Sequence, residues 1–304
     1  MIFQRTIKGP ISAIGVGLHS GCRVSLNLKP GKNDQGIIFV RTDLADRPAI
    51  LCHPLLVNDT RLSSTLVDNN LVRVGTIEHL MSAFACFGID NITVELSAQE
   101  TPIMDGSSNS FLYLLEQAGI MELSARKKYI RIKETIEVRS EAENKWVRFS
   151  PFPGYKVKII TDFGGHPVFK QEYSTFEADF SQHSYIDEIS RARTFGFMYE
   201  VESMRKNGLG LGGNLNNAIV LDEDSVLNEG GLRFPDEFVR HKILDAIGDL
   251  YIMGHQFIGA FEGYRSGHAM NNQLLRKIIN HPESWEYVTF NNPDDVPGSF
   301  HYLR

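Results

Sequence analysis

A succession of helix, glycine, strand, loop and helix occurs twice along this chain of 304 residues. In the first copy, helical periodicity over Thr76–Phe87 stops at Gly88, and a strand pattern over Ile92–Leu96 follows. A loop containing Asp105-Gly106-Ser107 then leads to a second helical pattern over Phe111–Ala118. A glycine directly after a helical run indicates a helix C-terminus, because glycine adopts the left-handed conformation at little cost.

The second copy begins with a helical pattern over Glu237–Met253 that stops at Gly254. A strand pattern over Phe257–Phe261 follows, and a helical pattern near Asn271–Ile279 closes the copy. The repetition predicts an α+β fold of two similar domains, each with helices packed on one face of a sheet. Residue identity between the copies is low, so chance recurrence stays open as an alternative.

A basic stretch, Ala125–Lys128, lies between the two copies and precedes new strand patterns at Ile130–Ile132 and Ile136–Val138. We place a domain boundary there, which predicts a first domain over residues 1–126 and a second over residues 127–304. At roughly 150 residues per domain, the length of the chain also favours two domains.

The charge balance and the cysteines narrow the class of protein. With 31 Lys and Arg against 37 Asp and Glu, the net charge of −6 argues against nucleic acid as a partner. The chain has no run of about 18 apolar residues and no uninterrupted apolar stretch at its N-terminus, so we expect neither a transmembrane segment nor a secretory signal. Three cysteines (Cys22, Cys52 and Cys86) favour a reducing cytoplasm over a disulfide framework. Any metal ion would then be held by His and carboxylate side chains.

A histidine and an aspartate four residues apart in the second long helical pattern are candidate metal ligands. His241 and Asp245 project from the same face of that helix, a spacing suited to binding one metal ion. The alternative is an ordinary contact that supports the helix. The helical stripe itself is completed by the apolar residues Ile243, Leu244 and Ile247.

The first long helical pattern carries Glu78 and His79 in its first turn, with Thr76 as the expected N-cap. A lone Glu at this position would also complement the helix dipole, which is the alternative explanation. If the two halves pack helix to helix, His79 meets His241 and Asp245 and completes a His₂-carboxylate site.

Three protein ligands that leave a coordination position open are typical of catalytic zinc. Glu78, next to a ligand, is then placed to take a proton from water, and His268, in the predicted loop SGHA, to donate a proton to a leaving group. These parts predict hydrolysis of an amide or ester. The competing hypothesis is a binding protein with a structural metal, which the open position and the neighbouring Glu argue against.

The segment from Phe195 to Leu221 combines apolar side chains with glycines, including GLGLGG at Gly208–Gly213. A dinucleotide loop is rejected, because a helical pattern precedes these glycines and a strand pattern follows them. The segment predicts an apolar insert that binds the apolar part of a substrate. The alternative is that these side chains only pack in the core of the second domain.

Six sequence blocks stand in the order found in one enzyme family: GVGLHSG (Gly15–Gly21), TIEHL (Thr76–Leu80), PIMDGS (Pro102–Ser107), SRARTFGF (Ser190–Phe197), HKILDAIGDL (His241–Leu250) and RSGHA (Arg265–Ala269). Over essentially its whole length the chain resembles the UDP-3-O-acyl-N-acetylglucosamine deacetylases, cytoplasmic zinc hydrolases that commit Gram-negative bacteria to lipid A synthesis. The resemblance implies a fold of two βα sandwich domains with the helices between two sheets. It also implies UDP-3-O-acyl-N-acetylglucosamine as the substrate, and we expect a monomer.

The resemblance also implies roles for individual residues. His79, His241 and Asp245 would ligate zinc, or iron(II), which accepts the same ligands. Glu78 would be the general base, His268 the general acid, and Thr194 a hydrogen-bond donor to the oxyanion.

Substrate contacts follow from the same resemblance. Lys242 and Arg265 would meet the diphosphate, with Lys145 as a further cation, and Phe163 would stack on uracil. The residues expected along the acyl passage are Phe195, Phe197, Val201, Gly210, Asn214 and Ala218. Two departures stand out: Arg265 replaces the usual Lys, and Ser63 replaces a cysteine, so we expect weaker inhibition by an extra metal ion.

Overall fold

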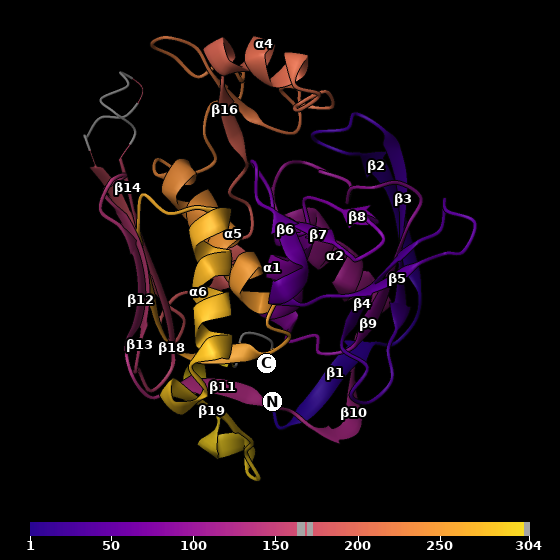
Figure 1. Ribbon diagram of the computed structural model, residues 1–304, viewed down its shortest axis with the longest axis vertical. Coiled ribbons are helices and arrows are strands. Elements are labelled where there is room, and N and C mark those ends of the chain that lie inside the picture. The colour runs from indigo at the N-terminus through magenta and orange to yellow at the C-terminus, as the bar shows by residue number, and fades with distance from the viewer. Residues whose placement is uncertain (163–167, 169–172, 301–304) are drawn as a thin grey trace.

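The computed structural model describes residues 1–162, 168 and 173–300. Two sheets form the outer layers of the molecule, and the long helices lie between them (Figure 1). Helices and sheets are thus segregated into layers, which confirms the α+β fold class.

The first layer is a five-stranded sheet with the long helices of the first half against its inner face. Its central strand, β9 (Ile92–Leu96), is antiparallel to β3 (Arg23–Pro30) and parallel to β4 (Ile37–Arg41). In β3 every second side chain is buried, as its alternating pattern predicts. In spatial order the strands are β2 (Ile11–Val16), β3 (Arg23–Pro30), β9 (Ile92–Leu96), β4 (Ile37–Arg41) and β5 (Ala49–Leu51), and the helices are α1 (Glu78–Phe87) and α2 (Asn109–Ala118).

Two small sheets complete the first half. They are the pair β1 (Phe3–Ile7) and β10 (Ile120–Arg126), and the three strands β6 (Val57–Asp59), β7 (Thr65–Val67) and β8 (Arg73–Val74), with a short 3₁₀ turn at Pro54–Leu56.

The second layer is a seven-stranded sheet organised around β18 (Gln256–Tyr264). This strand is parallel to β11 (Tyr129–Ile132) and β14 (Tyr155–Asp162) and antiparallel to β13 (Lys145–Ser150). Its strands are β12 (Ile136–Ser140), β13 (Lys145–Ser150), β18 (Gln256–Tyr264), β11 (Tyr129–Ile132), β19 (Trp285–Val288), β14 (Tyr155–Asp162) and β15 (Tyr173–Asp179). Three helices of this half are α3 (Tyr185–Glu188), α5 (Glu237–Tyr251) and α6 (His268–Asn280), and 3₁₀ turns follow at Pro282–Ser284, Pro293–Asp295 and Gly298–Phe300.

Helices α1 and α5 face each other at the centre of the molecule. Every residue of α1 is buried, and α5 contributes Gly248 to the contact. A Cβ atom at Gly248 would overlap the carbonyl oxygen of Glu78, so a glycine is required for this close approach. The first turn of α1 is thereby held against the middle of α5.

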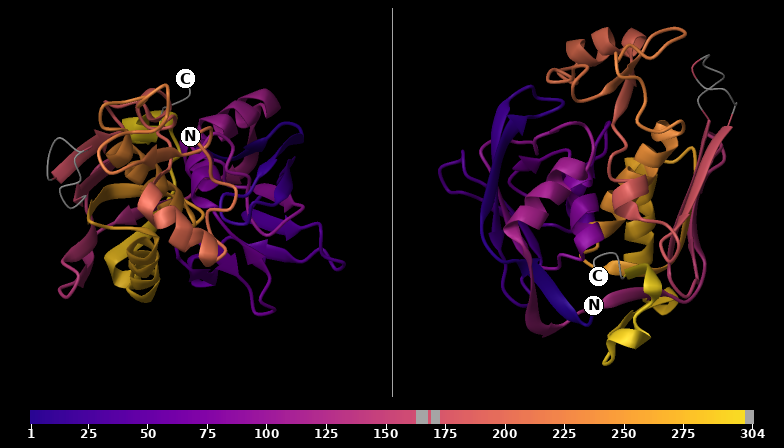
Figure 2. Two further views of the ribbon diagram at one scale, coloured as in Figure 1. Left: turned by 90° about the horizontal axis from the view of Figure 1, so that it is seen from above. Right: turned by 180° about the vertical axis from the view of Figure 1, so that it is seen from behind.

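An arm rises from the second half at one end of the molecule, above the interface between the layers (Figure 1; Figure 2, right). It consists of β16 (Phe195–Phe197), α4 (Met198–Lys206) and β17 (Ile219–Leu221), with β16 and β17 paired in parallel. Gly208 follows α4 with a φ of 72°, the left-handed conformation in which a glycine commonly ends a helix. No helix among the described residues has the length and apolar character needed to cross a membrane.

Most expected elements are present, with three local corrections. Thr76 is not the N-cap of α1, because its hydroxyl donates 2.7 Å to Glu100 and the helix begins after Ile77. The helix α5 ends at Tyr251, before the expected Met253. His268 is the first residue of α6 and does not lie in a loop. The domain division at residues 126 and 127 stays a prediction.

Candidate metal centre and its cleft

Three buried side chains from α1 and α5 converge on one point. Nε2 of His79 lies 3.4 Å from Oδ1 of Asp245, and Nε2 of His241 lies 3.3 Å from the same oxygen. One ligand atom from each residue lies within 4.8 Å of the others. Oδ1 of Asp245 is buried and accepts no hydrogen bond within the described part of the chain. Two imidazoles and an unsatisfied carboxylate oxygen fit a divalent cation such as zinc.

Hydrogen bonding outside the triad sets the orientation of His241. Its Nδ1 lies 3.0 Å from the carbonyl oxygen of Ala192, which can only accept, so Nδ1 carries the proton and Nε2 faces the triad. The carboxylate of Glu237, at the start of α5, accepts from the backbone N–H of Arg193 at 3.0 Å and from its guanidinium at 2.8 Å. This ion pair holds the segment that carries the Ala192 carbonyl.

The electrostatics of the triad favour cation binding. Burial lowers the pKa of His241 to about 4, which leaves the ring neutral near pH 7, as a metal ligand must be. Burial alone would raise the pKa of Asp245, but His241 and Lys242 outweigh it and hold that pKa well below its usual value. The aspartate is therefore ionised.

Glu78 lies beside the triad and is only 2% exposed. Its Oε2 accepts a hydrogen bond of 3.0 Å from the backbone N–H of Ser64, and its Oε1 lies 3.9 Å from Nε2 of His268. Burial raises the pKa of Glu78 to about 7, a value suited to accepting a proton at neutral pH.

His268 faces Glu78 from the first turn of α6. Its Nδ1 lies 2.9 Å from Oδ2 of Asp249, so Nδ1 donates to this carboxylate and Nε2 points toward the centre. Burial opposes protonation, but Asp249 and Glu78 outweigh it and raise the pKa of His268 to about 10. The ring is therefore a cation at neutral pH, able to donate a proton.

Sequence reasoning missed Asp249, although a signal for it exists. Asp249 follows Asp245 by four residues on α5, so it shares the face of His241 and Asp245. It is 2% exposed and also accepts a hydrogen bond of 2.8 Å from Asn271. A second aspartate in this register, one turn beyond the two candidate ligands, indicates a further polar partner at the site.

The triad opens into a cleft of about 960 Å³ that runs beneath the arm. All the candidate site residues within the described chain line this cleft, namely Glu78, His79, Lys145, Thr194, Phe195, Phe197, Val201, Gly210, Asn214, Ala218, His241, Lys242, Asp245, Arg265 and His268. Phe163 lies outside the described residues. Leu18 and His19, from the block GVGLHSG, also line the cleft and had no expected role.

The candidate cations of the cleft have different acidic neighbours. Nζ of Lys242 lies 3.4 Å from Oδ2 of Asp245 and 5.6 Å from the centre of the Phe195 ring. Nζ of Lys145 lies 3.3 Å from Glu143, and the Arg265 guanidinium lies 3.9 Å from Asp162. Lys242 is thus next to the triad.

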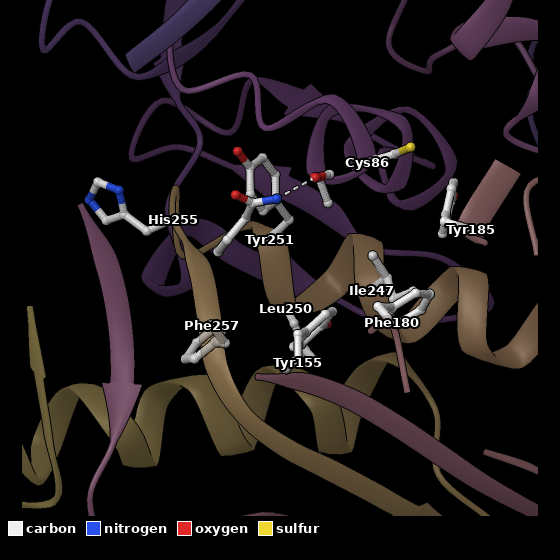
Figure 3. A pocket seen from close by; sticks show the side chains of 11 residues that line it. Cys86, Tyr155, Phe180, Tyr185, Ile247, Leu250, Tyr251, His255 and Phe257 are labelled. Atoms are coloured by element: carbon white, nitrogen blue, oxygen red, sulfur yellow. Dashed lines mark hydrogen bonds between the residues drawn. The ribbon is translucent and has the colours of Figure 1, made fainter. Parts of the chain in front are cut away.

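A second cavity, of about 20 Å³, lies between α1, α5 and the seven-stranded sheet and is lined mainly by apolar side chains, among them Tyr155, Phe180 and Ile247 (Figure 3). Gln256, also in its wall, donates a hydrogen bond of 2.8 Å to the carbonyl oxygen of Ala85. A space of this size holds about one water molecule, so it is no substrate site.

Comparison with known proteins agrees with this geometry. A family model described as LpxC, UDP-3-O-acyl N-acetylglycosamine deacetylase, matches residues 4–280. A UDP-3-O-acyl-N-acetylglucosamine deacetylase of Chromobacterium violaceum is 60% identical, over 100% of this chain and 99% of that protein. Proteins of the same name from Neisseria meningitidis serogroup A and Thioalkalivibrio sulfidiphilus are 57% and 54% identical, over 100% and 97% of this chain and 98% and 96% of theirs. The chain therefore belongs to the LpxC family of UDP-3-O-acyl N-acetylglycosamine deacetylases.

Proposed function

We propose that this protein hydrolyses the N-acetyl group of UDP-3-O-acyl-N-acetylglucosamine and releases acetate, the committed step of lipid A biosynthesis. The observation that carries this proposal is the cluster of His79, His241 and Asp245, whose ligand atoms lie within 4.8 Å of one another beside Glu78 and His268. A metal-dependent amide hydrolase needs a metal site with a general base and a general acid beside it. Membership of the deacetylase family supports the same reaction.

The ion proposed for the triad is Zn²⁺, and Fe²⁺ is the second candidate because it accepts the same ligands. When bound, such a cation makes water more acidic and polarises a carbonyl oxygen. His79, His241 and Asp245 would hold it.

The protein's own residues would move the protons. Glu78 takes the proton of the attacking water, as its pKa of about 7 allows. Thr194 donates a hydrogen bond to the carbonyl oxygen as negative charge develops on it. His268, held protonated by Asp249, gives its proton to the departing amine.

The same cleft would bind the rest of the substrate. Lys242, Arg265 and Lys145 are the proposed contacts of the diphosphate, and Phe163 that of the uracil ring. The arm would receive the 3-O-acyl chain along Phe195, Phe197, Val201, Gly210, Asn214 and Ala218. An amphiphilic substrate matches a cleft that joins cationic and apolar walls.

We further propose that the protein works as a monomer in the cytoplasm, with residues 1–126 and 127–304 as its two domains. Glu78 and His79 come from the first domain, whereas His241, Asp245 and His268 come from the second. Neither domain alone would then be active.

Acetate release from UDP-3-O-acyl-N-acetylglucosamine tests the proposal. Purified protein loaded with Zn²⁺ should release one acetate per substrate, lose this activity with a chelator and regain it when Zn²⁺ is restored. The 3-O-deacylated substrate, UDP-N-acetylglucosamine, is the control and should react much more slowly. Absence of acetate from the acylated substrate, with metal bound, contradicts the proposal.

A further inference from the structure

Ser64 lies where α1 and α5 meet, in the loop just before β7, and is only 1% exposed. It belongs to none of the six sequence blocks that indicated the site, and no role was expected for it. Its three polar groups nevertheless all form hydrogen bonds at the site, two with the start of α1, which carries the candidate base, and one with Asp249 on α5, the partner of the candidate acid.

The backbone of Ser64 is bound to the start of α1. Its carbonyl oxygen accepts a hydrogen bond of 3.3 Å from the N–H of Ile77, and its own N–H donates 3.0 Å to Oε2 of Glu78. The loop thus satisfies a helix N-terminal donor and fixes one carboxylate oxygen of Glu78. Any residue except proline would provide these two backbone bonds at position 64.

The side chain of Ser64 reaches the other half of the molecule. Its hydroxyl donates a hydrogen bond of 2.6 Å to Oδ1 of Asp249, on α5. The other oxygen of Asp249, Oδ2, accepts from Nδ1 of His268 and from Nδ2 of Asn271. Donors on both oxygens prevent rotation of the Asp249 carboxylate. The Ser64 hydroxyl therefore fixes the orientation of this carboxylate relative to the His268 ring.

We propose that Ser64 is a positioning residue that couples the candidate base to the candidate acid. Its backbone N–H aims Glu78, and its hydroxyl aims His268 through Asp249. The two proton-transfer groups, which come from different halves of the chain, therefore keep a fixed geometry relative to one residue. This inference rests on the proposed function, because the proposed function assigns Glu78 the role of base and His268 the role of acid.

Two substitutions of nearly equal shape isolate the hydroxyl. Ser64→Thr keeps it and Ser64→Val replaces it with a methyl group, so any effect of added volume is common to both. We expect Ser64→Thr to keep kcat within about threefold of the wild type, and Ser64→Val to lower kcat by about tenfold or more relative to Thr. KM and bound metal should be alike in the two variants. Equal kcat for Thr and Val overturns the proposal.

A double-mutant cycle tests whether the effect runs through Asp249. In the wild-type background Ser64→Ala should lower kcat by about tenfold, whereas in an Asp249→Ala background it should cost less than about twofold. A tenfold cost in both backgrounds would mean that Ser64 acts independently of Asp249, and the coupling would be wrong. Thermal unfolding of each metal-loaded protein shows that the cycle compares folded enzymes.

Failure of this inference is distinguishable from failure of the proposed function. The wild-type protein reports on the function, because acetate release there does not depend on any variant. The ratios between Thr and Val, and between the two backgrounds, report on Ser64 alone.

Discussion

Helices α1 and α5 occupy equivalent places in the successions α1–β9–α2 and α5–β18–α6, yet they meet the metal centre in different ways. Helix α1 begins at the centre and contributes Glu78 and His79 from its first turn. Helix α5 passes the centre along its side and contributes His241, Asp245 and Asp249, each one turn apart. Helices in similar positions therefore contribute different numbers of side chains to the centre, and α5, which runs past the centre, contributes more of them.

The difference has a structural cause. A helix that ends at a site presents one turn to it, whereas a helix that crosses the site presents one side chain per turn. Gly248 allows the crossing, because it lets the backbone of α5 touch the carbonyl of Glu78. Substitutions on α1 and on α5 therefore have separate expected effects.

Loss of a ligand from α5 should have the largest effect. We expect His241→Ala to abolish stoichiometric binding of the metal and to lower deacetylase activity by more than about 10³-fold, because only two protein ligands remain. Metal analysis after dialysis, together with acetate release, measures both. The exposed residue His281 offers a control, and His281→Ala should keep metal and activity. Full metal content in His241→Ala would contradict the assignment.

Asp249, the partner of His268 on α5, should set the alkaline limit of the pH range in which the enzyme is active. Glu78, the base, must be unprotonated, so activity falls as pH drops below about 7. A cation bound beside Glu78 lowers its pKa and moves this acid limb to lower pH. The acid must be protonated, so activity falls as pH rises through about 10.

Removing the charge of Asp249 lowers the pKa of His268, and Asp249→Asn should therefore move the alkaline limb to lower pH. His268→Ala should lower kcat by about 10²-fold and lose that limb. Profiles of kcat against pH for the three proteins make the comparison. An alkaline limb that is unchanged in both variants removes His268 from the role of acid.

The close approach of the two helices should be visible in stability. Alanine is a better helix former than glycine by about 1 kcal/mol, so Gly248→Ala would stabilise a free helix. Here the added Cβ meets the backbone of Glu78, and we expect a loss of about 1–3 kcal/mol in the free energy of unfolding. Gly9→Ala is the control, because a Cβ there meets nothing within 4 Å. Chemical denaturation compares them, and a stabilised Gly248→Ala protein would contradict the packing.

The smallest effect is expected in the arm, away from both helices. Val201→Arg places a charge in the apolar wall of the cleft. It should raise KM for UDP-3-O-acyl-N-acetylglucosamine by about 3- to 10-fold, with little change in kcat. Glu202, its exposed neighbour on α4, is outside the cleft lining, so Glu202→Gln should leave KM unchanged. Steady-state kinetics of both variants decides whether the arm receives the acyl chain. An unchanged KM in Val201→Arg would exclude Val201 from that wall.

Local periodicity was enough to place His241 and Asp245 together, because four residues on a helix bring two side chains to one face. The position of His79 beside them depended on how the halves pack, and the repeated pattern suggested that packing without proving it. The helix start at Thr76 was wrong because a distant carboxylate, Glu100, binds the hydroxyl that a helix N-cap would use.

Ser64 and Asp249 mark the limit of such reasoning. Ser64 lies in an irregular loop, and its contact with Asp249 spans 185 residues of sequence. Asp249 had the right register, but a register does not tell which of its oxygens meets His268. Contacts between loops and distant helices are set by tertiary packing, which leaves no periodic trace in the sequence.

The most direct test of the central claim, a metal-dependent hydrolase in which α1 supplies the base, is a joint measurement on Glu78→Gln. This variant keeps the size of the side chain and removes its basicity. Metal content and acetate release should be measured on the same preparation. We predict wild-type metal content with kcat lowered by about 10²- to 10⁴-fold. Full metal content with undiminished acetate release would contradict the claim.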